Sequence, residues 1–175
     1  MLINKKPLHP NFGVIIEDID INQVSHNFLY KEIRELFENY SVILFKNQKI
    51  SDDTHINFAK LFGQLENREA MATNSDVEFE LSLVTNQKED KSVYDEYDIK
   101  TLDLKANMLW HTDSTFLPIP ALANIITAKI IPSSGGQTEL ASTRVALKKL
   151  PKDLYNNIKD KKIWHNLSHS RKQIN

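Results

Sequence analysis

The order of helical and strand-like segments constrains the fold of this 175-residue chain more than any other feature. Apolar residues repeat at helical spacing in two early segments, whereas short apolar runs of strand length dominate the middle. Two further helical segments follow near the end. Because helices and strands do not alternate regularly, the pattern argues against a doubly wound parallel sheet and predicts an α+β fold. A chain of this length fits one domain, and we expect residues 1–175 to form it.

The early part is predicted to contain two strands and two helices. Apolar/acidic alternation predicts a half-buried strand at 14–21, and a continuous apolar run predicts a buried strand at 41–45. An amphipathic helix is predicted between them, at 27–39. Ser51 suits the N-cap of the second helix and Gly63 its C-cap. The apolar face of that helix is expected to comprise His55, Phe58, Ala59 and Phe62.

The later part is predicted to be richer in strands. Strands are expected at 79–85, 108–113, 124–131, 137–141 and 163–169, and helices at 143–150 and 152–160. The polar, weakly periodic segment 86–105 has two interpretations. It is either a solvated loop or a mobile lid over a site, since long loops in compact domains are often functional.

Composition excludes several classes of function. The formal net charge is −1, so no global field favours nucleic acid or an anionic membrane. The chain has no cysteine, which excludes disulfides, thiolate metal sites and cysteine nucleophiles. No apolar run reaches the length of a membrane span, and the first residues lack the apolar segment of a signal peptide. We therefore expect a cytoplasmic protein that binds neither nucleic acid nor membrane.

The pair His111 and Asp113 is the main candidate for chemistry. Residues two apart in an extended strand point to the same face, so an imidazole and a carboxylate could reach one metal ion together. They would supply two thirds of the 2-His-1-carboxylate triad that holds iron(II) and leaves open positions. From spacing alone, the alternative is an ordinary histidine that hydrogen-bonds a nearby acid.

The segments around this pair resemble the TauD/TfdA family, named for taurine and 2,4-dichlorophenoxyacetate dioxygenases. The resemblance is carried by WHTDSTF at 110–116 and GGQTELA at 135–141, and further by YSVILFKNQ at 40–48 and FAKLFGQLE at 58–66. LPIPA at 117–121 and SHSR at 168–171 are most similar to the aryloxyacetate dioxygenase branch. The similarity covers nearly the whole chain.

The resemblance implies an iron(II)- and 2-oxoglutarate-dependent dioxygenase. Its core would be a double-stranded β-helix, or jelly roll, of the clavaminate synthase-like type with flanking helices. His111 and Asp113 align with the first two iron ligands, and Thr138 with the threonine that hydrogen-bonds a 2-oxoglutarate carboxylate. Asn107 aligns with a substrate-contacting position, although an Asn before a strand is also a common turn residue. The implied reaction hydroxylates a small anionic organic substrate with O2 and releases succinate and CO2. Oligomeric state is left open.

Two departures from the family qualify this expectation. Arg68 and Met71 occupy positions where the taurine branch has a His and a Tyr that bind sulfonate, so taurine is not the expected substrate. The family also continues past this length, and the resemblance places the distal His ligand and the 2-oxoglutarate-clamping Arg outside this chain. His165 and His169 align with non-ligand positions. Two alternatives therefore stay open: a non-catalytic fragment or binding module with an incomplete metal site, and a cupin-like zinc hydrolase.

Overall fold

The computed structural model describes residues 3–66, 81–166, 168, 169 and 172. The chain separates into two compact units. The sheet unit comprises Met1–Gly63 with Ile125–Lys162, and the motif unit comprises Gln64–Asn124 with Ile163–Asn175. Because the described residues form one small sheet and several helices, the α+β class is confirmed. The single-domain expectation stays a prediction.

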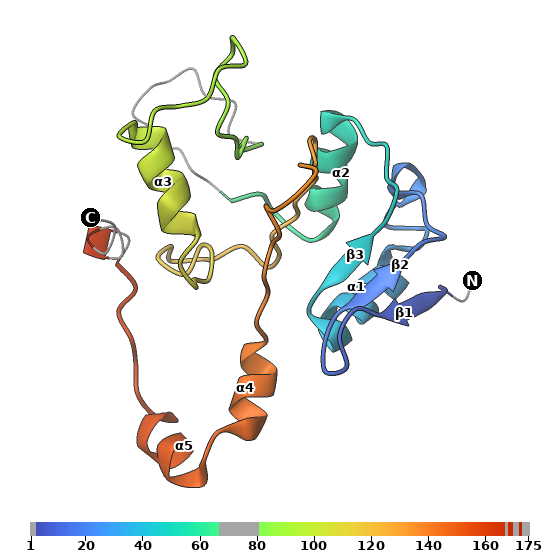
Figure 1. The fold of residues 1–175 in the computed structure, drawn as a ribbon. Coiled ribbons are helices and arrows are strands. Elements are labelled where there is room, and N and C mark those ends of the chain that lie inside the picture. The colour runs from blue at the N-terminus through green and yellow to red at the C-terminus, as the bar shows by residue number, and fades with distance from the viewer. Residues whose placement is uncertain (1–2, 67–80, 167, 170–171, 173–175) are drawn as a thin grey trace. The chain divides into compact units, whose positions relative to one another are not determined.

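The sheet has three short strands in the order β1–β2–β3 (Figure 1). Strand β1 (Lys5–Pro7) is antiparallel to β2 (Val14–Ile16), with Lys5 opposite Ile16. Strand β3 (Ile43–Phe45) is parallel to β2, with Val14 opposite Ile43. Parallel neighbours need a crossover connection, and helix α1 (Tyr30–Tyr40) lies within the chain between them.

The predicted strand at 14–21 is wrong beyond Ile16. A 3-10 helix, η1 (Ile21–Gln23), occupies its end, and the Asp20 carboxylate caps it by accepting from the Asn22 N–H at 3.0 Å. Ile19 and Ile21 are nevertheless buried. The alternating pattern therefore reflects the burial of apolar side chains in a turn. This burial does not require strand pairing.

The hydrophobic core lies in the sheet unit. Its buried cluster joins residues of β2, the β2–η1 connection, η1, α1 and α2 (Asp52–Leu61): Ile16, Ile19, Ile21, Ile33, Leu36 and Phe58. Helix α1 confirms the amphipathic pattern, with Ile33 and Leu36 on its buried face. Helix α1 ends at Ser41, which has a left-handed backbone conformation. The strand predicted at 41–45 is therefore confirmed only at β3. Leu44 is 41% exposed, which corrects the expectation that this strand is buried on both faces.

Helix α2 begins as its sequence predicts. The Ser51 side chain accepts from the Thr54 N–H at 3.1 Å, and Asp52 and Asp53 lie in the first turn. Such caps satisfy backbone N–H groups that have no partner within the helix. Phe58 is buried and packs edge-to-face on Phe45 and Phe62.

The later strand predictions are wrong in the described residues. No strand forms at 81–85, 108–113, 124–131, 137–141 or 163–166, although each has strand-like composition. A strand is stable only when its backbone groups pair with a neighbour, and these segments have no laddered partner in the described part of the chain. The helix predictions are confirmed by α4 (Thr143–Lys149) and α5 (Lys152–Ile158).

The segment 86–105 is not a continuous loop. Helix α3 (Ile99–Asn107) begins inside it, and the Asp98 side chain caps this helix by accepting from the Lys100 N–H at 2.9 Å. The apolar periodicity of this segment is too weak to indicate a helix. Asp98, a residue type that favours the N-cap position, is the local sequence signal for the start of α3.

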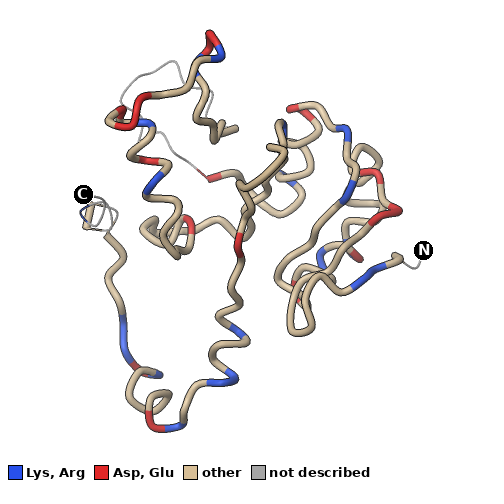
Figure 2. The backbone as a smooth tube through the Cα atoms, viewed as in Figure 1, with Lys and Arg blue, Asp and Glu red and all other residues tan. Residues whose placement is uncertain are grey.

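Acidic and basic residues are interspersed along the backbone in Figure 2. In the sheet unit they meet as surface ion pairs, in which Glu17 lies 2.5 Å from the Lys6 ammonium and 3.3 Å from that of Lys46. Hydrogen bonds from these two lysines lower the pKa of Glu17. Among the described residues, no helix combines the length and the apolar character that crossing a membrane requires.

Candidate functional site

The His111–Asp113 pair lies in irregular backbone of the motif unit, shortly after helix α3 ends at Asn107. The predicted strand geometry is wrong here, yet the two side chains still meet. His111 Nε2 lies 3.2 Å from Asp113 Oδ1, and both side chains are about half exposed. Strand alternation therefore does not explain their proximity, because residues 111–113 form no strand.

The backbone sets the tautomer of His111. Its Nδ1 lies 2.6 Å from the Leu109 carbonyl oxygen, which can only accept, so Nδ1 carries the hydrogen. In a neutral ring, Nε2 then presents a lone pair toward the Asp113 carboxylate. Two acceptors that face one another at this distance are stabilised by a shared proton or by a cation between them. The arrangement is the one found for metal-ligating histidines, whose other nitrogen donates to a carbonyl or carboxylate.

The separation of the two atoms fits a shared divalent metal ion. An ion bound at about 2.1 Å to two ligands at right angles places those ligands about 3.0 Å apart. The Nε2 to Oδ1 distance of 3.2 Å is close to this value. Among the described residues, however, no group of three His, Cys, Asp or Glu side chains is arranged to hold a metal. The described residues thus fit two ligands of a metal site.

The other oxygen of Asp113 is also engaged. Asn124 Nδ2 donates to Asp113 Oδ2 at 2.5 Å. This contact leaves Oδ1 as the oxygen that faces His111. The sequence predicts only a strand at Asn124, because no local pattern links residues 11 positions apart.

The turn after Asp113 has an unusual backbone. Ser114 adopts a positive φ of 62° and is 7% exposed, although left-handed backbone costs a non-glycine residue about 1 kcal/mol. Its hydroxyl donates to Glu66, and its carbonyl accepts from the Leu117 N–H at 2.9 Å. These contacts hold the turn that separates the pair from the following segment.

His165 belongs to the same unit but has a different partner. Its Nδ1 lies 3.0 Å from Thr115 Oγ1, and Thr112 Oγ1 donates to the same hydroxyl at 3.2 Å. It does not join His111 and Asp113 in a three-ligand group.

The remaining predicted residues are described within their own units. Asn107 is the exposed last residue of α3, so the turn interpretation of its position is wrong. Thr138 lies in irregular, exposed backbone of the sheet unit, after Gly135 and Gly136. Both glycines have positive φ, at 74° and 70°, which forms the tight connection that the sequence predicts. Arg68 and Met71 lie outside the described residues.

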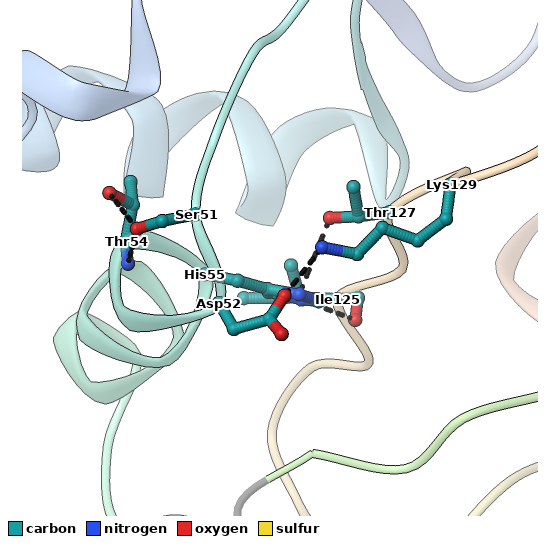
Figure 3. Close-up of polar contacts among 7 residues, drawn as sticks. All are labelled: Ser51, Asp52, Thr54, His55, Ile125, Thr127 and Lys129. Carbon is teal, nitrogen blue, oxygen red and sulfur yellow. Dashed lines mark hydrogen bonds and ion pairs between the residues drawn. The ribbon is translucent and has the colours of Figure 1, made fainter.

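A second polar cluster lies in the sheet unit, between α2 and residues 125–129 (Figure 3). His55 Nε2 donates to the Ile125 carbonyl at 3.0 Å, and Thr127 Oγ1 lies 3.4 Å from His55 Nδ1. Lys129 Nζ contacts Asp52 Oδ1 at 2.5 Å and lowers the pKa of that carboxyl. The sequence placed His55 on the buried face of α2 but could not identify the segment that it holds.

Comparisons with known proteins identify a family and several relatives. The family model "Taurine catabolism dioxygenase TauD, TfdA family" matches residues 4–174. The α-ketoglutarate-dependent 2,4-dichlorophenoxyacetate dioxygenase of Cupriavidus pinatubonensis is 33% identical over 174 residues, which are 98% of this chain and 61% of the relative. The (S)-phenoxypropionate/α-ketoglutarate dioxygenase of Sphingobium herbicidovorans is 28% identical over 170 residues, covering 96% of this chain and 55% of the relative.

A solved structure shows the same similarity. The crystal structure of AAD-2 in complex with Mn(II) and N-oxalylglycine superposes with a TM-score of 0.83 at 27% identity. The superposition covers 98% of this chain and 59% of AAD-2. The chain thus spans between 55% and 61% of the length of these three relatives. Because the family model matches almost every residue, the chain belongs to the TauD/TfdA dioxygenase family.

Proposed function

We propose that this chain forms part of an iron(II)- and 2-oxoglutarate-dependent dioxygenase that hydroxylates a small aryloxy carboxylate. One observation carries the proposal: His111 Nε2 and Asp113 Oδ1 face each other at 3.2 Å while their other polar atoms are engaged. The substrate class is inferred from the named substrates of the relatives, which are phenoxyacetate and phenoxypropionate derivatives. We also propose the family's jelly-roll core, which the small observed sheet does not itself reveal.

The roles of the chain's residues follow from their chemistry. His111 would contribute a neutral nitrogen ligand, and Asp113 a carboxylate that offsets one positive charge of the ion. The Thr138 hydroxyl would donate to a carboxylate of 2-oxoglutarate, and Asn107 would contact the substrate. When bound, iron(II) would supply the centre at which dioxygen and 2-oxoglutarate react to give hydroxylated product, succinate and CO2.

Metal binding to the chain is the first test. We expect anaerobic titration to show iron(II) binding and a visible charge-transfer absorption when 2-oxoglutarate chelates the bound ion. His111→Ala and Asp113→Ala should both lose this absorption, because each removes one of the two ligands. His26→Ala is the matched control, since it removes an exposed histidine of the sheet unit. Equal absorption in His111→Ala and wild type would refute the metal assignment.

Turnover is the second test. Succinate release from 2-oxoglutarate, measured with iron(II), O2 and an aryloxyacetate, should accompany hydroxylation. Thr138→Val should raise the KM for 2-oxoglutarate about fivefold, the effect of losing a hydrogen bond of about 1 kcal/mol. His111→Ala should abolish release.

The second candidate is a binding module of the same fold without catalysis. One observation favours this candidate. The described residues supply two metal ligands, and the triad needs three. Iron(II) and 2-oxoglutarate binding without succinate release would support this candidate over the dioxygenase.

A further inference from the structure

The contact between Asn124 and Asp113 has a consequence for metal binding. The bond joins two side chains of the motif unit, at a length of 2.5 Å, and its acceptor is a carboxylate. Because a carboxylate oxygen only accepts, the Asn124 atom that faces it is the amide nitrogen. Hydrogen bonds to an ionised acceptor are roughly twice as strong as those between neutral groups.

A carboxylate without such a contact does not select one oxygen. Rotation about the terminal torsion of aspartate is broad and roughly two-fold, so either oxygen can face a given direction. At Asp113 the half-exposed carboxylate would otherwise alternate between His111 and water. The Asn124 amide occupies Oδ2 and leaves Oδ1 directed at His111 Nε2.

An amide also suits this place because it is neutral. A lysine or arginine at the same position would orient the carboxylate but would offset its negative charge. The charge is what attracts a divalent ion to an exposed site. Asn124 thus orients the ligand and preserves its full charge.

We propose that Asn124 is a positioning residue for the metal ligand Asp113, an inference that rests on the proposed function. It donates to Oδ2 so that Oδ1 and His111 Nε2 are oriented together for one divalent ion. Partners of this kind commonly change metal affinity by about tenfold to a hundredfold when removed. No sequence pattern predicts the hydrogen bond between Asn124 and Asp113, which only the folded chain shows.

The test compares Asn124→Ala with Asn86→Ala, which makes the same change in the same unit at a side chain with no hydrogen-bond partner among the described residues. Mn(II) serves as the probe, and the decrease of the free-ion electron paramagnetic resonance signal measures its binding to the 175-residue chain. We expect Asn124→Ala to raise the Mn(II) Kd at least about tenfold. Asn86→Ala should bind as wild type does and should unfold at the wild-type temperature without metal.

A metal-free readout examines the contact itself. The side-chain amide resonances of Asn124 in a 15N-correlated NMR spectrum should shift in Asp113→Ala and stay in place in Asn86→Ala. Asn124→Gln, which keeps the amide donor, should recover part of the lost Mn(II) affinity.

The outcomes separate the inference from the proposed function. If wild type binds Mn(II), Asp113→Ala does not, and Asn124→Ala equals wild type, the positioning role is refuted and the metal site stands. If wild type does not bind Mn(II), or if His111→Ala binds equally well, the proposed metal site itself is wrong. A tenfold loss in Asn124→Ala that Asn86→Ala does not share, together with the NMR shift, supports the positioning role.

Discussion

Replacing His55 by alanine should destabilise the sheet unit through the loss of the ring's hydrogen bonds and packing. The ring is 9% exposed, and its Nε2 donates to the Ile125 carbonyl at 3.0 Å. Its other nitrogen lies 3.4 Å from the Thr127 hydroxyl, which can donate to it. One neutral tautomer therefore satisfies both contacts. His55→Ala removes them and leaves the Ile125 carbonyl without its protein partner.

The expected loss has two parts. Removing one partner of a buried hydrogen bond costs about 1–3 kcal/mol, and the lower end applies because Ile125 is only partly buried and water can reach it. Loss of the ring's packing against the core adds about 1 kcal/mol. The sum is about 2 kcal/mol, which corresponds to a Tm lowered by roughly 4–8 °C in a chain of this size.

The assay is thermal and urea unfolding followed by circular dichroism. His55→Gln is the informative partner variant, because its amide can donate to the same carbonyl and should recover about half of the lost stability. Thr127→Val should cost less than about 0.5 kcal/mol, since the 3.4 Å contact is long. A Tm for His55→Ala within about 1 °C of wild type would refute the reasoning.

Three further predictions concern the sheet unit. Ser51→Ala removes the cap that accepts from the Thr54 N–H, and urea unfolding should show a loss of about 1 kcal/mol. Ile33→Ala, at a fully buried position, should cost about 2–5 kcal/mol in the same assay, whereas Ile130→Ala, at a position 75% exposed, should change stability by less than about 0.5 kcal/mol. The hydrogen bond from Lys129 lowers the folded-state pKa of Asp52 below its ordinary value of 3.8. The stability that this pair contributes is therefore present above pH 3.8 and lost as the pH falls through the folded-state pKa, and acid unfolding of Asp52→Asn should lack this component. Acid titrations of Asp52→Asn and wild type that run parallel below this pH would contradict the assignment.

The helices were predictable because their signals are local. Ser51 caps α2 through a backbone group three residues away, and the apolar repeat of α1 places Ile33 on the buried face. Helix α3 is not predicted because its segment is polar and weakly periodic, although its cap, Asp98, is also a local signal. The predicted strands after residue 80 failed for a different reason. Composition indicates that a segment can form a strand, but pairing depends on a neighbour that the segment does not contain.

The sequence by itself determined the family and the candidate site residues, since His111, Asp113 and Thr138 lie within the segments that carry the family resemblance. It also suggested that the imidazole and the carboxylate would meet, although it assigned the wrong backbone geometry. Only the tertiary structure decided how they meet. The Leu109 carbonyl selects the histidine tautomer, and Asn124 selects the carboxylate oxygen. Such choices depend on hydrogen bonds between groups brought together by turns, and the bond from Asn124 to Asp113 spans 11 positions that no local pattern connects.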